Sequence, residues 1–315
     1  MGMTYVASEG KIFYTDSQDY SDAQGDCSLP GNPPALGSFD PTTLSPIGGL
    51  WYLQTGATTQ HPYQSLRYIM EVPEPWKTSI GNNFLASGRH RGWCLEGSHI
   101  YASAPGNPAA DSTVTAVKLL EFGPFVADSP YPWNPAWHYP KEHSLANAYQ
   151  GAVWLTTGST AAVVLSGIID NDPASSYYGY AGWVLPSQCE PTESCPPGGR
   201  GWRAAEPQPA LLLYDPDDLV DVYTSTQSTW EPQWYAKVDL SPYMRRSYAP
   251  TYLTTGADAE VLLPTFDRAH GLLYISESFA DGILPLVHVF SVDAPAMGGA
   301  GGVIHGATLQ GGELR

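Results

Sequence analysis

One short segment of this chain occurs three times in closely similar form. The copies are Trp51–Gly56 (WYLQTG), Val153–Gly158 (VWLTTG) and Thr251–Gly256 (TYLTTG), and their first residues are 102 and 98 positions apart. Self-similarity at a long and nearly constant spacing is typical of one supersecondary unit that packs against copies of itself. The chain is therefore predicted to be built from repeated units.

Each copy is followed by three further runs of β-branched or aromatic residues, bounded by Gly, Pro, Asn or Asp. They are Phe84–Gly92, Ser98–Ser103 and Thr115–Phe122; Ala162–Ile169, Tyr178–Leu185 and Ala210–Tyr214; and Val261–Phe266, Gly271–Ser276 and Pro285–Ser291. Four such runs predict a four-stranded antiparallel meander, which is one blade of a β-propeller. The predicted fold is all-β, a propeller of four or five blades.

The N-terminus fits this scheme in part. Lys11–Thr15 resembles a third strand, and Ala35–Leu44 resembles Ala210–Leu219, a fourth strand that runs into a turn. The first blade is thus expected to be incomplete, and three ways to complete it stay open: the Gly-rich tail around Gly298–Gly306, an additional N-terminal segment, or another subunit that completes the blade in trans. We expect one propeller domain over residues 1–293 and a tail over 294–315.

Composition agrees with an all-β protein outside the cytoplasm. The 32 Gly and 29 Pro punctuate strands and would interrupt helices. No apolar run approaches the roughly 18 residues of a membrane span, and no signal peptide is recognised at the N-terminus. We expect a secreted or periplasmic protein.

The net charge of −17 argues against nucleic acid or an anionic membrane as a partner, because both require a basic surface. An acidic chain suits cation binding, and equally a protein that is simply kept dispersed. Cys189 and Cys195 flank a short loop that a disulfide would close. Cys27 and Cys94 are expected either to pair across blades or to remain two buried thiols.

Propeller topology predicts which loops share a face. Connections between second and third strands lie on the same face as those that lead to the next blade. That face is predicted to collect the candidate residues Arg89, His90, Arg91, Trp93, Glu96, Asp170, Asn171, Asp172, His270, Trp133, Trp137, Trp230 and Trp234. Long loops in compact domains usually carry function.

Oxygen ligands at alternate positions make Asp170, Asn171 and Asp172 a candidate Ca²⁺ site. The alternative is an Asx turn, because Asp-Asn-Asp-Pro forms one readily. His90, between Arg89 and Arg91, is a candidate base that neighbouring positive charge would keep neutral. The alternative for His90 is an ion-paired strand end, and His270 is a second candidate base or part of a hairpin turn.

Two carboxylates near the third strands, Glu96 and Glu277, are candidates for acid–base work. A pair about 5 to 9.5 Å apart would permit glycoside hydrolysis. The arginines, Trp93 and the four loop tryptophans are candidates for substrate binding, since aromatic rings stack on sugars or acyl chains. No nucleophile elbow, HExxH helix, P-loop or dinucleotide motif is present.

The runs Gly199–Arg203 and Ala210–Leu219, with the ending Leu272–Glu277 to Pro285–Phe290, resemble a group of largely uncharacterised bacterial propeller-like proteins. At fold level the chain is also similar to calcium-dependent propeller lactonases, which hold a metal on the ring axis with Asp, Asn and Glu. Their spaced ligand motifs are not recognised here. The resemblance implies a propeller and transfers no activity.

These observations favour an enzyme, a calcium-assisted hydrolase of a small ester or lactone with His90 or His270 as base. A non-catalytic propeller that binds glycan or protein is the alternative. A glycoside hydrolase that uses Glu96 and Glu277 is the third option.

Overall fold

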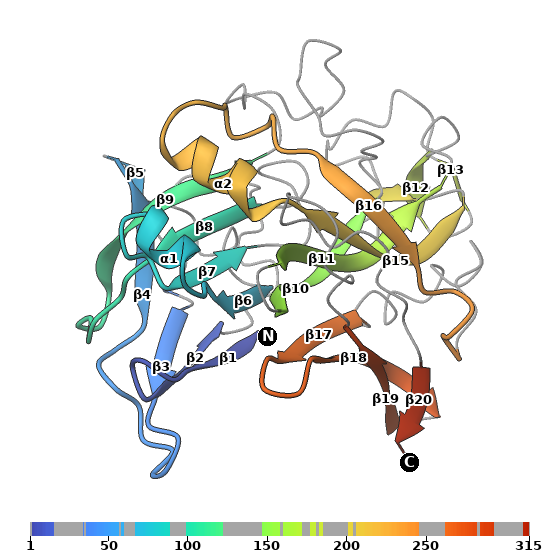
Figure 1. Cartoon of the computed structure of the whole chain (residues 1–315), viewed down its shortest axis with the longest axis horizontal. Coiled ribbons are helices and arrows are strands. Elements are labelled where there is room, and N and C mark those ends of the chain that lie inside the picture. The colour runs from blue at the N-terminus through green and yellow to red at the C-terminus, as the bar shows by residue number, and fades with distance from the viewer. Residues whose placement is uncertain are drawn as a thin grey trace.

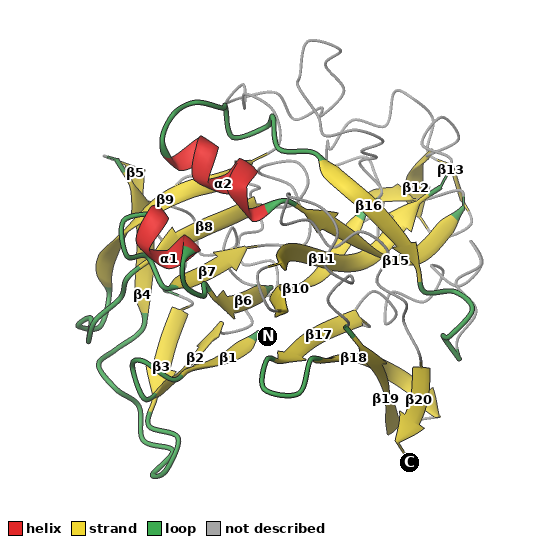
Figure 2. Ribbon diagram, viewed as in Figure 1, coloured by secondary structure: helices red, strands yellow, loops and turns green. Residues whose placement is uncertain are grey.

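A computed structural model describes residues 2–15, 34, 36–56, 58–59, 67–88, 99–121, 147–157, 160–171, 177–180, 183–184, 201–203, 206–245, 262–281, 284–292 and 311–314. These residues form β-strands and two short helices, as Figure 2 shows. The structure confirms the prediction of an all-β fold. Among the described residues, neither helix has the length and apolar character needed to cross a lipid bilayer.

The largest sheet has nine strands and comes from the N-terminal part of the chain. They are β1 (Met3–Val6), β2 (Lys11–Thr15), β3 (Leu36–Phe39), β4 (Trp51–Thr55), β5 (Thr58–Thr59), β6 (Tyr68–Glu71), β7 (Leu85–Gly88), β8 (His99–Ser103) and β9 (Ser112–Glu121). β1 to β4 pair antiparallel in chain order, and so do β6 to β9. A parallel pairing of β4 with β9 joins these two halves.

A second sheet has the order β10-β11-β15-β16, and its adjacent strands are antiparallel. Its strands are β10 (Ala148–Thr157), β11 (Thr160–Asp170), β15 (Pro207–Tyr214) and β16 (Trp234–Asp239). A small sheet of β12 (Tyr177–Tyr180), β13 (Trp183–Val184) and β14 (Gly201–Arg203) is inserted between β11 and β15. The second sheet is thus a meander with one excursion.

The last sheet is a four-stranded antiparallel meander. It contains β17 (Leu262–Asp267), β18 (Leu272–Asp281), β19 (Leu284–Ser291) and β20 (Gly311–Leu314). The described end of the chain therefore adds a strand to its own last sheet. The described end of the tail, 311–314, does not complete the first blade, because it pairs with β19.

The predicted strand order is wrong at one or more positions in each unit, and in the second and third units strands are displaced by one position. Trp51–Thr55 is not the first strand of the first meander, because it pairs with β3 and β9 while β6 takes the first position. Tyr177–Tyr180 lies in the small sheet, so β15 is the third strand of its meander instead of the fourth. The third copy, 251–256, lies outside the described residues, and β17 opens the last sheet. Local sequence similarity does not determine which distant strand a segment pairs with.

Both helices lie at the same ends of their sheets (Figure 1). Helix α1 (Trp76–Ser79) follows β6, and α2 (Pro216–Tyr223) follows β15. The indole Nε1 of Trp76 donates to Asp217 Oδ1 at 2.9 Å and joins the two helices. We call this side the helix side. The loop side is the opposite one, where β6, β10 and β15 begin and β11 ends at Asp170, opposite Pro207.

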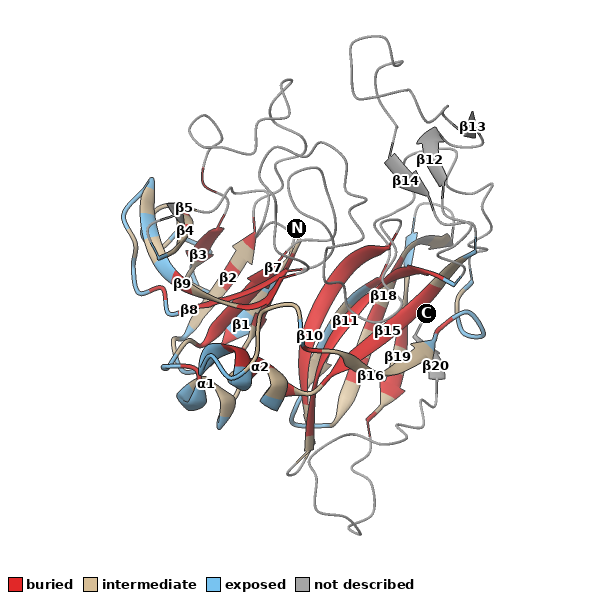
Figure 3. Ribbon diagram, turned by 90° about the horizontal axis from the view of Figure 1, so that it is seen from above, coloured by how far each residue is buried: buried red, intermediate tan, exposed pale blue. Residues whose placement is uncertain are grey.

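The core lies between neighbouring sheets. β6 lies beside β1 and β10, and β10 lies beside β17. One cluster joins Met70 and Ile100 to Trp154 and Val163, and another joins Val153 and Leu211 to Leu273 and Phe290. Alternate residues of β10 therefore enter different clusters, and the central strands are buried on both faces (Figure 3).

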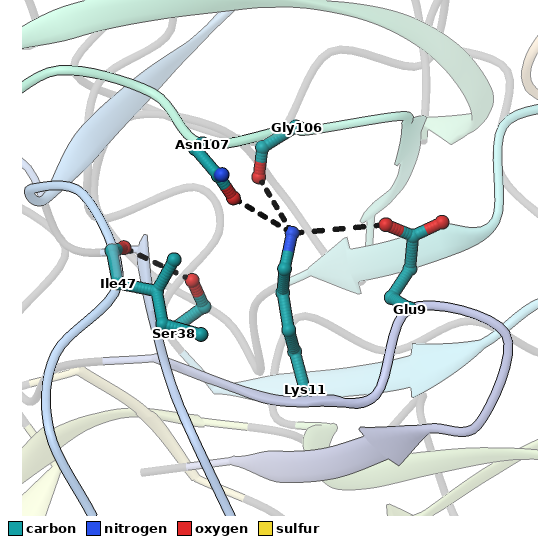
Figure 4. A network of polar contacts seen from close by, with 6 residues as sticks. All are labelled: Glu9, Lys11, Ser38, Ile47, Gly106 and Asn107. Carbon is teal, nitrogen blue, oxygen red and sulfur yellow. Dashed lines mark hydrogen bonds and ion pairs between the residues drawn. The ribbon is translucent and has the colours of Figure 1, made fainter.

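Polar contacts connect segments that are distant in the sequence. Lys11 Nζ donates to Asn107 Oδ1 at 2.8 Å and to the Gly106 carbonyl at 3.2 Å, and lies 3.7 Å from Glu9 Oε2 (Figure 4). Close by, Ser38 Oγ donates to the Ile47 carbonyl at 3.2 Å. Lys11 thereby ties the turn between β1 and β2 to the segment that leads into β9.

Arg268, in the hairpin between β17 and β18, forms an ion pair with Glu71 at the end of β6 and donates to its carbonyl. This contact holds the last sheet to the first on the helix side. Replacing Arg268 by Met is expected to lower the free energy of unfolding by about 1 kcal/mol, a modest value because both side chains are partly exposed. Chemical denaturation measures it.

Lys77→Met is the matched control, since its ion pair with Glu74 spans 3.2 Å on the surface within one turn of chain. We expect no measurable loss there. Equal stabilities for the two variants would contradict a role for Arg268 in holding the sheets together.

Candidate functional site

A carboxylate and an imidazole occupy core-facing positions in the last sheet. Residues of one strand alternate between its two faces, and Glu277 shares the face of Leu273 and Ile275. His288 pairs directly with Ile275 in the neighbouring strand, so its side chain enters the same face. The register therefore places Glu277 and His288 diagonally next to each other.

The two side chains form a buried hydrogen-bonded pair. His288 Nε2 lies 2.8 Å from Glu277 Oε2, and the same oxygen accepts from the backbone N–H of Arg245 at 3.0 Å. Glu277 is 0% exposed and His288 4%. An oxygen that already accepts from a backbone N–H is an acceptor for His288 as well, so Nε2 carries the ring proton. This tautomer leaves the lone pair on Nδ1.

A turn after β16 packs beside this pair. Leu240 accepts from the backbone N–H groups of Tyr243 and Met244, which shapes the turn that brings Arg245 to Glu277. The Tyr243 ring meets Phe290 edge-on at 5.3 Å, and Phe290 stacks with His288 at 6.4 Å. His288 is thus oriented by a carboxylate on one side and an aromatic ring on the other.

This arrangement has the chemistry of a general base. A carboxylate that accepts from one ring nitrogen fixes the tautomer, and it stabilises the imidazolium that forms when the other nitrogen takes a proton. Among the described residues, no hydrogen bond engages His288 Nδ1. Nδ1 is therefore the nitrogen that can accept a proton from a reacting group.

Asp170 ends β11 on the loop side and is 2% exposed. Its backbone N–H donates to Asn147 Oδ1 at 2.8 Å, and Asn147 Nδ2 donates to the Tyr149 hydroxyl at 3.2 Å. Glu277 lies on the same side. The end of β16 pairs with the start of β15 on the loop side, and Arg245, which follows β16, donates its backbone N–H to Glu277. The structure therefore brings two of the predicted acidic residues to one side.

The residues predicted to bind calcium fit that role only in part. Asn171 Oδ1 accepts from the Lys237 ammonium at 2.7 Å, and a cation already occupies the position where a metal would bind this oxygen. Asp172 lies outside the described residues. Among the described residues, no three His, Cys, Asp or Glu side chains form a metal-binding group. Asn171 does not fit a calcium ligand in this arrangement.

His270 lies on the opposite side of the sheets from Asp170 and Glu277. Its Nδ1 is 2.6 Å from Asp267 Oδ2, and Asp267 Oδ1 accepts from the backbone N–H groups of Ala269 and His270. The His270 contact and these backbone donors hold the pKa of Asp267 below its ordinary value. The residues form the β17–β18 hairpin next to Arg268, on the helix side. His270 is therefore not brought together with Asp170 or Glu277.

The one-strand displacement explains this placement. With β17 as the first strand of its sheet, the Asp267–His270 turn joins strands one and two, which puts it on the other face from that predicted. The same reason moves Trp230 and Trp234 to the helix side, because they follow the third strand, β15. Trp234 begins β16 opposite Tyr214 and packs against the core, and Trp230 is half-buried.

The remaining candidates lie outside the described residues. They are Arg89, His90, Arg91, Trp93, Glu96, Trp133, Trp137 and Asp172, together with Cys27, Cys94, Cys189 and Cys195. The segment 89–98 does connect β7 and β8, the second and third strands of their meander, as predicted.

Two buried tyrosines of the core, Tyr149 and Tyr214, are not candidate bases. Burial raises the pKa of Tyr149, and it raises that of Tyr214 well above its ordinary value, with smaller contributions from Tyr149 and Tyr68. The Tyr68 hydroxyl donates to the His99 carbonyl at 2.6 Å. Tyr149 and Tyr214 therefore stay protonated at physiological pH.

His288 is the candidate site residue that sequence reasoning missed. Its signal is the period of two: in Leu284–Ser291 it occupies the same face as Phe290, and Glu277 occupies the face of Ile275. Charged or titratable residues are rarely fully buried unless paired. Two of them at core positions of adjacent strands therefore predict a pair.

Comparisons of this chain with protein-family models, with curated proteins and with solved structures gave no match. A function for this chain is therefore argued from the geometry of the Glu277–His288 pair and its surroundings.

Proposed function

We propose that this chain is a hydrolase of small esters or lactones in which His288, oriented by Glu277, is the general base. The observation that carries the proposal is the buried 2.8 Å contact between Glu277 Oε2 and His288 Nε2, with Arg245 N–H on the same oxygen. His288 takes the role expected of His90 or His270, because it has a carboxylate partner on the loop side.

The step follows from the tautomer. His288 Nδ1 takes a proton from water as the water oxygen bonds to the carbonyl carbon, and Glu277 stabilises the imidazolium. The proton then passes to the leaving oxygen as its bond to carbon breaks. Acid and alcohol are the products, or a hydroxy acid from a lactone.

We also propose that the chain forms four blades of a β-propeller, arranged around a common axis. β6–β9, β10-β11-β15-β16 and β17–β20 are antiparallel meanders, which supports three blades. The first strands β6, β10 and β17 lie next to one another in order, with β1 beside β6. Neighbouring first strands around an axis are the arrangement expected of a propeller.

We propose separately that Asp170 and Asp172 bind Ca²⁺. Asn171 is left out of the ligand set because Lys237 holds its oxygen. No step of the hydrolysis is assigned to the metal.

A second candidate function is non-catalytic binding of a glycan or protein on the loop side. The complete burial of Glu277 favours it, since a fully buried pair is also a means of orienting the Leu240–Arg245 turn. The glycoside hydrolase alternative needs a second carboxylate, and Glu96 lies outside the described residues.

A substrate panel separates these functions. We expect the purified chain to hydrolyse at least one member of a set of 4-nitrophenyl esters and γ- and δ-lactones, and none of a set of 4-nitrophenyl glycosides. Parallel assays with a chelator report on calcium. Turnover of glycosides alone would favour the third option, and no turnover at all, with retained binding to a glycan array, would support the non-catalytic one.

A further inference from the structure

The turn that follows β16 runs along β19 at the level of His288. The Tyr243 ring in this turn contacts Phe290, which lies two residues after His288 on the same face of β19. The backbone N–H of Arg245 donates to Glu277, which pairs with the residue two positions before His288. Contacts on both sides of His288 therefore place the segment Tyr243–Arg245 across it.

This segment has a buried side and an exposed side. Met244, its middle residue, packs against the core cluster that contains Phe290, and Phe290 is itself 0% exposed. His288 is 4% exposed, whereas Tyr243 is 40% exposed and Arg245 is exposed too. The segment therefore separates the imidazole from solvent on this side of the last sheet, and we call it the cover of His288.

A substrate that reacts at His288 has to pass this cover, and Tyr243 is the part of it that can yield. Leu240, at the start of the turn, is fully buried, and the Arg245 N–H is engaged in its bond to the carboxylate. Tyr243 instead approaches Phe290 edge-on from the exposed side, at 5.3 Å and an interplanar angle of 83°. Exposed side chains change rotamer within picoseconds to nanoseconds, so the ring can move while the rest of the turn stays in place.

We propose that Tyr243 is the specificity-determining residue of this site, and that its ring limits the size of the acyl group beside His288. The proposal rests on the proposed hydrolase function. A short acyl group fits next to the ring, whereas a long one must displace the ring and break its contact with Phe290. A single methylene in a filled apolar pocket typically changes kcat/KM by about 10-fold or more. The geometry therefore assigns the site to esters of short acyl groups.

Chemical modification measures access to His288 independently of turnover. Diethyl pyrocarbonate reacts with neutral imidazole: a ring nitrogen bonds to one carbonyl carbon, and the ring proton leaves with ethyl carbonate, which breaks down to ethanol and carbon dioxide. Peptide mass spectrometry follows His288 and, in the same sample, His270, whose side chain is 72% exposed. We expect His288 to react about 10-fold faster or more in Tyr243→Ala than in the wild type, with no change at His270.

Two variants control for the loss of the ring. Tyr243→Phe keeps the ring and its contact with Phe290, so His288 should react with the reagent at the wild-type rate. Tyr223→Ala removes another tyrosine of similar exposure, 37%, at the end of α2 on the helix side. It should leave both the modification of His288 and the hydrolysis of esters unchanged. Circular dichroism verifies that each variant is folded.

A series of 4-nitrophenyl esters with acetate, butyrate and octanoate as acyl groups tests the size limit. We expect Tyr243→Ala to raise the ratio of kcat/KM for octanoate over acetate by about 10-fold or more, mainly through KM. An unchanged ratio, or equal rates of His288 modification in Tyr243→Ala and the wild type, would overturn the size limit. Faster modification without turnover of any ester by any variant would refute the hydrolase and the size limit together.

Discussion

Replacing Glu277 by Ala is expected to lower the free energy of unfolding by about 3–5 kcal/mol, the range for removing one partner of a buried polar pair. The substitution removes the acceptor of His288 Nε2–H and of the Arg245 backbone N–H, at a side chain that is 0% exposed. Denaturant unfolding followed by tryptophan fluorescence measures the loss.

Two further variants show where this loss comes from. Glu277→Gln keeps the shape and one oxygen acceptor, and we expect it to retain more than half of the lost stability. Glu231→Ala removes an exposed carboxylate that also accepts a backbone N–H, that of Ser228, and should cost less than about 1 kcal/mol. If Glu277→Ala and Glu231→Ala destabilise equally, the burial of the pair has no energetic consequence.

Gly88→Ala is also expected to destabilise the chain strongly. Gly88 ends β7 opposite Tyr68, and a Cβ atom there would lie 1.8 Å from the His99 carbonyl oxygen and 2.4 Å from Tyr68 Cε2. The same carbonyl accepts from the Tyr68 hydroxyl. Either β8 or the buried tyrosine must move, and we expect a loss of about 3 kcal/mol in the free energy of unfolding.

Gly106→Ala is the control for this substitution. A Cβ atom at Gly106 meets nothing within 4 Å, and its carbonyl contact with Lys11 is unaffected. Its effect should stay within about 0.5 kcal/mol. A melting temperature for Gly88→Ala equal to that of Gly106→Ala would contradict the packing of β7 against β8.

The sequence predicts most of the strands because they are short, β-branched or aromatic and bounded by Gly and Pro. It does not predict their order, since that depends on non-local pairing. Tyr68–Glu71 has no counterpart among the repeats, yet it opens the first meander. Helix α2 also carries a readable signal that the strand-and-turn interpretation of Ala210–Leu219 does not use: Asp215 caps the helix by accepting from the Asp217 N–H at 3.0 Å, with Pro216 in the first turn.

The candidate site is predictable only in part for the same reasons. The sequence indicates Glu277 as a carboxylate near a third strand, but its partner His288 becomes visible only when two adjacent strands are placed in register. A displacement of one strand exchanges the two faces of a meander, which is why His270, Trp230 and Trp234 lie on the helix side instead of with Asp170. Residue type is readable from the sequence, and the side of the sheet is not.

The proposed hydrolase depends above all on His288, held by Glu277, as the group that moves the proton. The sharpest test compares kcat and KM of the wild type, His288→Gln and His270→Gln on the ester or lactone that the panel identifies. Circular dichroism first verifies that all three proteins are folded under the assay conditions. We predict that His288→Gln lowers kcat by about 100-fold or more with little change in KM, while His270→Gln retains the wild-type rate. An unchanged kcat in His288→Gln would show that His288 is not the base.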